Sequence, residues 1–189
     1  KGGDANNKEK FNRDTGEWCI TVGDSAEAWA KSIGKIVAGK YPAKKLTIDL
    51  SEIRPAGERL KGYGWISSGD HQIAIAYKAI ADIFNKAAGR LLTRLEILDL
   101  INWLGTVLSS RRSAEICLMA YGEPEWQEFS TAKLNCGATG NPQRYQSNNT
   151  LLFYEKPSRD DLRHVFALME QAGGPEPGFA NAAEALRRA

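Results

Sequence analysis

The stretch LTIDLSEIRPAGERLKGYGWISSGDHQ, residues 46–72, sets the architecture that we expect for this chain. At its start, Leu46, Ile48 and Leu50 alternate with polar residues, which is the pattern of a β-strand with one buried face. A basic, glycine-rich loop follows, and a helical pattern begins at Gln72. The glycines and cations of this loop are Gly57, Gly62, Gly64, Gly69, Arg54, Arg59 and Lys61.

This arrangement predicts a ligand site, because α/β proteins hold phosphate groups where a strand leads through a glycine-rich loop into a helix. Glycine lets backbone N–H groups approach an anion closely, and nearby cations supply positive charge. The alternative is a long surface loop whose charges face water, since loops longer than about 12 residues are either functional or disordered. The pattern by itself leaves both interpretations open.

The residues before the loop predict a βαβ unit. Glu17–Val22 has the alternation of a strand, and a second strand covers about 45–50. Between them, Asp24 or Ser25 can cap a helix that ends near Ala38. Two strands joined through a helix by short links imply a parallel sheet.

Further helices and strands are expected to alternate after the loop. A helix that ends near Leu108 has apolar residues on several sides, so we expect it to be buried. Thr93 and Glu96 form a capping-box signal at its start. The remaining elements are helices at about 72–87, 125–134, 159–171 and 182–188, and strands at about 114–120, 149–154 and from Phe179.

The composition is that of an ordinary globular protein, with 42% hydrophobic and 25% charged residues among 189. A formal net charge of +2 is too small to favour direct nucleic-acid binding or a membrane surface. No apolar run approaches the roughly 20 residues that a membrane span needs. Three cysteines without CxxC spacing favour a reducing, cytoplasmic location over a disulfide framework. Residues 1–16 are polar, and we expect an arm or linker there.

No complete catalytic or metal-binding motif is present in the sequence, since Walker, nucleophile-elbow and HExxH patterns are all missing. Cys19 and Cys117 alternate with apolar residues in expected strands, so we expect both in the core. Cys136 lies in an expected loop and is the most exposed candidate of the three. His71 and the pair Asn148–Asn149 can either contact a ligand or satisfy local hydrogen bonds.

Five stretches of the chain carry a resemblance to a known enzyme family. They are GDSAEAW (23–29), DLSEIRPAGERLKGYGWISSG (49–69), RRSAEICL (111–118), SNNTLLF (147–153) and EPGFAN (176–181). Together they resemble the monomeric-type class II, adenosylcobalamin-dependent ribonucleotide reductases. The stretches follow the family's order with similar spacing, from about Glu17 to the C-terminus.

The resemblance implies an α/β fold, as part of a ten-stranded α/β barrel, with residues 17–189 supplying the first half and the start of the second. It implies that SSRRSAE (109–115) is the specificity loop, which reads a deoxynucleotide effector, although the residues alone favour a solvated turn with a pair of surface arginines. Trp65 departs from the family, which has glycine there. The implied substrate-binding residues are Gly62, Gly64, Ser67, Ser68 and Gly69, and the implied effector-binding residues are Ser110, Arg111, Arg112 and Ser113.

The same resemblance implies that the catalytic residues lie outside this segment. The family's asparagine–proline–cysteine–x–glutamate motif, which carries the thiyl radical, is expected after Ala189, and the partner redox cysteine before Lys1. We therefore assign no catalytic role to Cys19, and we expect the adenosylcobalamin site elsewhere. The segment alone is expected to be inactive until a second chain or a missing segment completes the barrel.

The parent reaction implied by the family is the reduction of a ribonucleotide to its 2′-deoxy form by thiyl-radical chemistry, in which the cofactor generates the radical. A different hypothesis is a non-catalytic nucleotide-binding or assembly subunit that keeps a reductase-like fold. A third is an unrelated α/β domain without nucleotide binding. A cysteine two residues after an asparagine, beyond Ala189, would favour the enzyme over the other two hypotheses.

Overall fold

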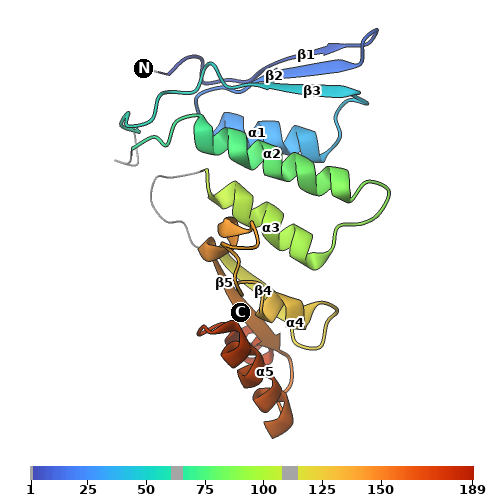
Figure 1. Cartoon of the computed structure of the whole chain (residues 1–189), viewed down its shortest axis with the longest axis vertical. Helices are drawn as coiled ribbons and strands as arrows, with labels where there is room; N and C mark the ends of the chain where they lie inside the picture. The colour runs from blue at the N-terminus through green and yellow to red at the C-terminus, as the bar shows by residue number, and fades with distance from the viewer. Residues whose placement is uncertain (1, 61–65, 108–114) are drawn as a thin grey trace. The chain divides into compact units, whose positions relative to one another are not determined.

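The computed structural model describes residues 2–60, 66–107 and 115–189, traced in colour in Figure 1. These residues form two compact units. Unit 1 holds the described residues up to Tyr77 together with Val107, and unit 2 holds residues 78–106 and 115–189. Each unit contains one three-stranded sheet, and each is described below by itself.

The sheet of unit 1 has the order β1-β2-β3. β2 (Glu17–Thr21) and β3 (Lys45–Asp49) run parallel, and α1 (Ala26–Val37) connects them. The predicted βαβ unit is therefore confirmed. β1 (Lys8–Asn12) pairs antiparallel with the other edge of β2.

The strand β1 lies within the N-terminal segment for which the sequence predicted an arm. Its burial alternates, with Glu9 and Phe11 facing inward. Glu9 forms an ion pair of 3.1 Å with Lys35, and Phe11 stacks on Tyr41 with ring centroids 4.7 Å apart. The strand was missed because one of its inward positions is a carboxylate, whose partner comes from a distant part of the chain. Charged side chains are typical of edge strands.

The core of unit 1 joins the sheet to its helices. Figure 1 shows α1 and α2 on the same side of the β1–β3 sheet. Tyr77 of α2 (His71–Lys86) packs edge-on against Trp29 of α1, with ring centroids 4.8 Å apart, and shares a hydrogen bond with the Ser32 hydroxyl. Burial raises the pKa of Tyr77 to about 12. The buried apolar side chains include Trp18, Ile20, Val22, Trp29, Ile33 and Ala76.

Unit 2 is built on the parallel sheet β4-β5-β6. Most of the predicted elements are present, although the helix expected over 125–134 is limited to α4, and the loop before β5 ends in a 3-10 helix. The elements are α3 (Arg94–Gly105), β4 (Glu115–Ala120), α4 (Trp126–Ser130), η1 (Pro142–Gln146), β5 (Ser147–Phe153), α5 (Arg159–Ala172), β6 (Gly178–Asn181) and α6 (Ala182–Arg188).

The helix starts follow local capping signals. Thr93 and Ser158 both form complete capping boxes, at α3 and α5 respectively, and the Asn181 side chain accepts a hydrogen bond from the Glu184 N–H at α6. The capping box at Thr93 was predicted from the sequence. It could be predicted because a cap links residues only three positions apart.

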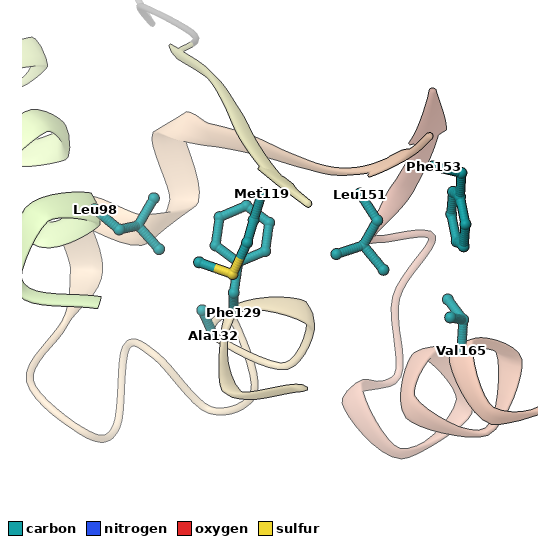
Figure 2. Packing of buried hydrophobic residues seen from close by; sticks show 7 residues of the cluster. All are labelled: Leu98, Met119, Phe129, Ala132, Leu151, Phe153 and Val165. Atoms are coloured by element: carbon teal, nitrogen blue, oxygen red, sulfur yellow. The ribbon is translucent and has the colours of Figure 1, made fainter. Parts of the chain in front are cut away.

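The core of unit 2 lies on one face of its sheet. Figure 2 shows Met119 of β4 beside Phe129 of α4, and Phe153 of β5 facing Val165 of α5. Leu151, which is fully buried, lies between these two pairs. The cluster consists of Leu98, Met119, Phe129, Ala132, Leu151, Phe153 and Val165.

The opposite face of this sheet carries apolar residues that remain exposed. Ile116 and Leu118 of β4 have exposed fractions of 74% and 55%. Parallel sheets are normally covered on both faces.

Helix α3 was expected to be buried, but Ile97 and Ile101 are exposed. The prediction was wrong for that side of the helix, because only the side with Leu98 faces the cluster.

The cluster gives a prediction about stability. Leu151→Ala should lower the free energy of unfolding by about 2–5 kcal/mol, because the buried site cannot collapse around the lost methyl groups. Leu91→Ala is the matched control in the same unit: Leu91 is 91% exposed, so the change should stay within about 0.5 kcal/mol. Urea unfolding followed by circular dichroism measures both, and equal effects of the two substitutions would contradict this packing.

Candidate functional site

The carboxyl ends of β2 and β3 meet at one edge of the unit 1 sheet, where α/β proteins commonly bind ligands. The Val22 N–H donates to the Asp49 carbonyl at 2.9 Å, which keeps the two chains together just past the strands. The Asp49 carboxylate accepts hydrogen bonds from the Ser51 N–H and the Thr21 hydroxyl, both at 3.0 Å. These donors, the backbone N–H first, hold the pKa of Asp49 below its usual range.

Residues 2–7, which we call the N-terminal strap, bind along this edge. The Gly3 N–H donates to the Glu52 carbonyl at 2.9 Å, and the Asp24 N–H donates to the Asp4 carbonyl at 2.7 Å. The Asn7 side chain accepts from the Gly23 N–H at 2.8 Å and donates to the Ala28 carbonyl at 2.7 Å. The strap thus satisfies backbone groups that would otherwise need water or a ligand.

The contact between the strap and the turn after β2 leaves no room for a side chain. A Cβ atom built on Gly23 would lie 2.6 Å from backbone atoms of Ala5 and Asn6. The carboxylates of Asp24, Asp49 and Glu52 cluster at the same edge, and the Asp4 N–H and the Lys8 ammonium hold the pKa of Glu52 below its usual range. Because the strap fills this edge and its carboxylates are already paired, the edge does not suit a phosphate group.

The glycine-rich loop continues away from this edge as a hairpin. The Gly57 N–H donates to the Ser67 carbonyl at 2.9 Å, and the Ser67 N–H donates to the Glu58 carbonyl at 2.7 Å. Arg59 and Ile66 form an antiparallel bridge next to these bonds. Gly62 and Gly64, two of the predicted substrate-binding residues, lie outside the described residues.

The other three predicted substrate-binding residues lie directly before α2. Ser67 is buried, and its hydroxyl accepts a hydrogen bond from the Gly69 N–H at 3.0 Å. Gly69 has φ +75, and a Cβ atom on it would lie 2.9 Å from the Ala56 nitrogen, so only glycine fits without strain. Ser68 is half-buried, and its hydroxyl makes no hydrogen bond within the described part of the chain.

The start of the helix that follows can attract an anion to this segment. α2 has 16 residues and begins at the exposed His71, directly after Gly69 and Asp70. The first turn of a helix presents unpaired N–H groups and the positive end of the helix dipole, which together attract anions. Ser68, Gly69 and the start of α2 are therefore the part of the loop that can hold a phosphate group.

The remaining predicted residues belong to other parts of the chain. Ser110, Arg111, Arg112 and Ser113, predicted to bind an effector, lie outside the described residues. Asn148 is exposed on β5, whereas Asn149 is buried and donates to the Phe129 carbonyl at 3.2 Å.

The cysteines differ from their predicted burial. Cys136 was expected to be the most exposed, but it is fully buried, because the turn around it is closed by the bond from the Asn141 N–H to the Cys136 carbonyl at 2.7 Å. Cys19 and Cys117 were expected in the core, and both are half-buried. Cys117 packs against the hydrophobic cluster of unit 2, whereas Cys19 lies on the face of β2 opposite the buried Trp18 and Ile20. None of the three forms a disulfide.

Sequence reasoning missed a buried polar cluster in unit 2. Arg144 of η1 forms two parallel hydrogen bonds with Asp99 of α3, at 2.6 and 2.7 Å, and it donates to the Ala132 carbonyl at 3.0 Å. The Asp99 carboxylate, as the largest influence, raises the pKa of Arg144. Gln143 also donates to Asp99 at 2.8 Å. No local signal links residues 45 positions apart, and the cluster holds η1 against α3 in a structural role.

Among residues 2–60, 66–107 and 115–189, no group of three or more histidine, cysteine, aspartate or glutamate side chains could hold a metal ion. In the same residues, no helix combines the length and the apolar character needed to cross a membrane.

The fold and site define an α/β protein built from parallel strand–helix units, and comparison with known proteins makes the class specific. A family model described as the insertion domain of B12-dependent ribonucleotide reductase matches residues 2–84. A probable adenosylcobalamin-dependent ribonucleoside-triphosphate reductase of Dictyostelium discoideum is 30% identical over 135 residues, covering 69% of this chain and 17% of that protein. The corresponding enzyme of Lactobacillus gasseri is 29% identical over 172 residues, covering 84% and 21%.

A solved structure agrees with these sequence matches. The crystal structure of a B12-dependent, class II ribonucleotide reductase superposes with a TM-score of 0.74 at 23% identity, covering 91% of this chain and 24% of that one. The chain is a segment of a class II ribonucleotide reductase, with part of the α/β barrel fold of that enzyme. It spans about a fifth of the length of the curated relatives that it matches.

The contact at Gly23 gives a prediction about the strap. Gly23→Ala should lower the free energy of unfolding by about 1–3 kcal/mol, because its methyl group overlaps the strap backbone. Gly34→Ala is the control: nothing lies within 4 Å of the added Cβ in α1, so alanine should stabilise by about 0.5–1 kcal/mol. Urea unfolding distinguishes the two, and a Gly23→Ala protein as stable as the parent would show that the strap does not bind there.

Proposed function

We propose that this chain is part of the catalytic polypeptide of a reductase that converts ribonucleoside triphosphates into their 2′-deoxy forms. The support is its similarity over most of its length to enzymes named adenosylcobalamin-dependent ribonucleoside-triphosphate reductases. The division into an arm at 1–16 and a barrel segment at 17–189 belongs to this proposal. In this proposal, the residues that react with the substrate carbon lie outside this chain.

The contribution of this chain is to hold the nucleotide. The observation that carries the proposal is the hairpin of the glycine-rich loop, which ends in Ser67, Ser68 and Gly69 at the start of α2. The Ser68 hydroxyl and the first N–H groups of α2 would bind substrate phosphate, while Ser67 shapes the turn through its bond to Gly69. Gly62 and Gly64 belong to the same predicted site through the family resemblance.

The second part of the proposal concerns specificity. Through the same resemblance, the loop with Ser110, Arg111, Arg112 and Ser113 binds a deoxynucleotide effector and influences which base is accepted. Guanidinium groups suit this role, because their planar donors match phosphate oxygens in pairs.

The proposal implies a cofactor and a completing partner. When bound, adenosylcobalamin supplies the radical, and no group among the described residues of this chain is assigned to hold it. The exposed apolar face with Ile116 and Leu118 supports a second chain or a further segment that covers the sheet. Three cysteines without a disulfide are compatible with a reducing cytoplasm, where a dithiol can supply electrons.

The decisive experiment uses the complete parent polypeptide. It is incubated with adenosylcobalamin, a dithiol and each ribonucleoside triphosphate, and deoxyribonucleotide is measured by chromatography. Product that requires all three components is expected. Nucleotide binding without product would favour a non-catalytic nucleotide-binding subunit instead.

The phosphate contact predicts a selective kinetic effect. In the complete polypeptide, Ser68→Ala should raise KM for the ribonucleotide about tenfold with little change in kcat, because a hydrogen bond to a charged phosphate is lost. Ser51→Ala, at an exposed position earlier in the same loop, is the control and should leave KM unchanged. An unchanged KM in Ser68→Ala would remove this residue from the site.

The effector loop predicts a change in allosteric response. Arg112→Ala in the complete polypeptide should alter which ribonucleotide a given deoxynucleotide effector favours, because a contact with the effector is removed. Reduction rates for paired substrates, measured with and without each effector, test this. Arg163→Ala, an exposed arginine on α5, provides the comparison, and an effector response equal to that of the parent would refute the assignment.

A further inference from the structure

We propose that Arg54, held by Asp24, is a positioning residue that sets the glycine-rich loop, and with it Ser67–Gly69, at the start of α2. This inference rests on the proposed function for its consequence in substrate binding, but its structural content can be tested without any nucleotide. The pairing of Asp24 with Arg54 was not predicted, because no pattern in the strands links positions 24 and 54.

Asp24 lies at the edge formed by the carboxyl ends of β2 and β3. It is between β2 and α1, where the sequence allowed either Asp24 or Ser25 to cap the helix. Ser25 takes that role by accepting a hydrogen bond from the Ala28 N–H at 3.0 Å. The Asp24 carboxylate is thereby available for another partner, while its own N–H is held by the strap through the Asp4 carbonyl.

Arg54 makes three kinds of contact from the first residues of the loop. Its Nε donates to both carboxylate oxygens of Asp24, at 3.0 and 2.9 Å, and its backbone N–H donates to Asp24 Oδ1 at 3.3 Å. Its Nη1 donates to the Arg59 carbonyl at 3.4 Å. One side chain therefore connects the rigid edge of the sheet to the first arm of the hairpin.

The environment makes this ion pair stronger than an ordinary surface pair. The side chains of Asp24 and Arg54 are only 10% and 21% exposed, so removing either one leaves the other as a poorly solvated charge. Lysine cannot replace the arginine, because a single ammonium group cannot reach the carboxylate and the Arg59 carbonyl with the same fixed geometry.

The first arm of the hairpin determines where the residues before α2 lie. The arm pairs with the second arm through the Gly57–Ser67 and Ser67–Glu58 hydrogen bonds. Gly69 then packs on the backbone of Ala56, which is two residues after Arg54. A shift at Arg54 therefore moves Ala56 and Gly57, and with them the turn that bears the Ser68 hydroxyl.

The experiment is hydrogen–deuterium exchange of the 189-residue chain, read by mass spectrometry on peptides that cover residues 55–70. In Asp24→Asn and in Arg54→Lys, the amides of Gly57, Ser67 and Gly69 should exchange about tenfold faster, while peptides from β2 and β3 keep their parent rates. The double variant should show no more than the larger single effect, because the two residues act as one unit.

Arg144→Lys is the matched control, since the Arg144–Asp99 pair of unit 2 has similar exposure, 15% and 13%, and Arg144 also donates to both carboxylate oxygens of its partner. It should leave exchange in residues 55–70 unchanged. If Asp24→Asn and Arg54→Lys both exchange in that segment at the rates of the parent protein, the positioning role is refuted. It is also refuted if Arg144→Lys speeds exchange there as much as they do.

Kinetics of the complete polypeptide then separate the two proposals. If exchange is faster and KM for the ribonucleotide rises about tenfold with kcat nearly unchanged, the positioning role and the phosphate contact both stand. Faster exchange with an unchanged KM keeps the positioning role and refutes the phosphate contact of the proposed function.

Discussion

The ion pair between Arg54 and Asp24 is the interaction on which the candidate site depends. It joins the loop after β3 to the turn after β2, and it is shielded from water on most sides. A shielded pair of this kind is costly to break, because one charge is left without its partner. Three features follow this ion pair along the chain: the hairpin, the buried Ser67 and the close approach of Gly69 to Ala56.

The strap changes where a ligand can bind in unit 1. The edge formed by the carboxyl ends of parallel strands is the usual ligand position in α/β folds. Here residues 2–7 satisfy the backbone groups of that edge. The proposed phosphate contact therefore belongs to the start of α2, about 20 residues after the strand, where N–H groups and the helix dipole favour an anion.

In both units some features were predictable from the sequence and others were not. The βαβ arrangement of β2, α1 and β3, the cap at Thr93 and the family resemblance all followed from patterns within a few residues. The strand β1 did not, because its inward Glu9 is paired with Lys35 from α1. Cys136 was predicted to be exposed from its loop composition, yet the folded turn buries it completely.

The sequence by itself determined the order of strands and helices, their caps and the class of enzyme to which the segment belongs, because periodicity, capping and motif spacing are properties of neighbouring residues. Only the tertiary structure decided that the strap fills the strand ends, that Asp24 pairs with Arg54 instead of capping α1, and that Asp99 pairs with Arg144. These contacts join residues about 20 to 50 positions apart. Which donor meets which acceptor at such separations depends on how the backbone is packed, and no local pattern records it.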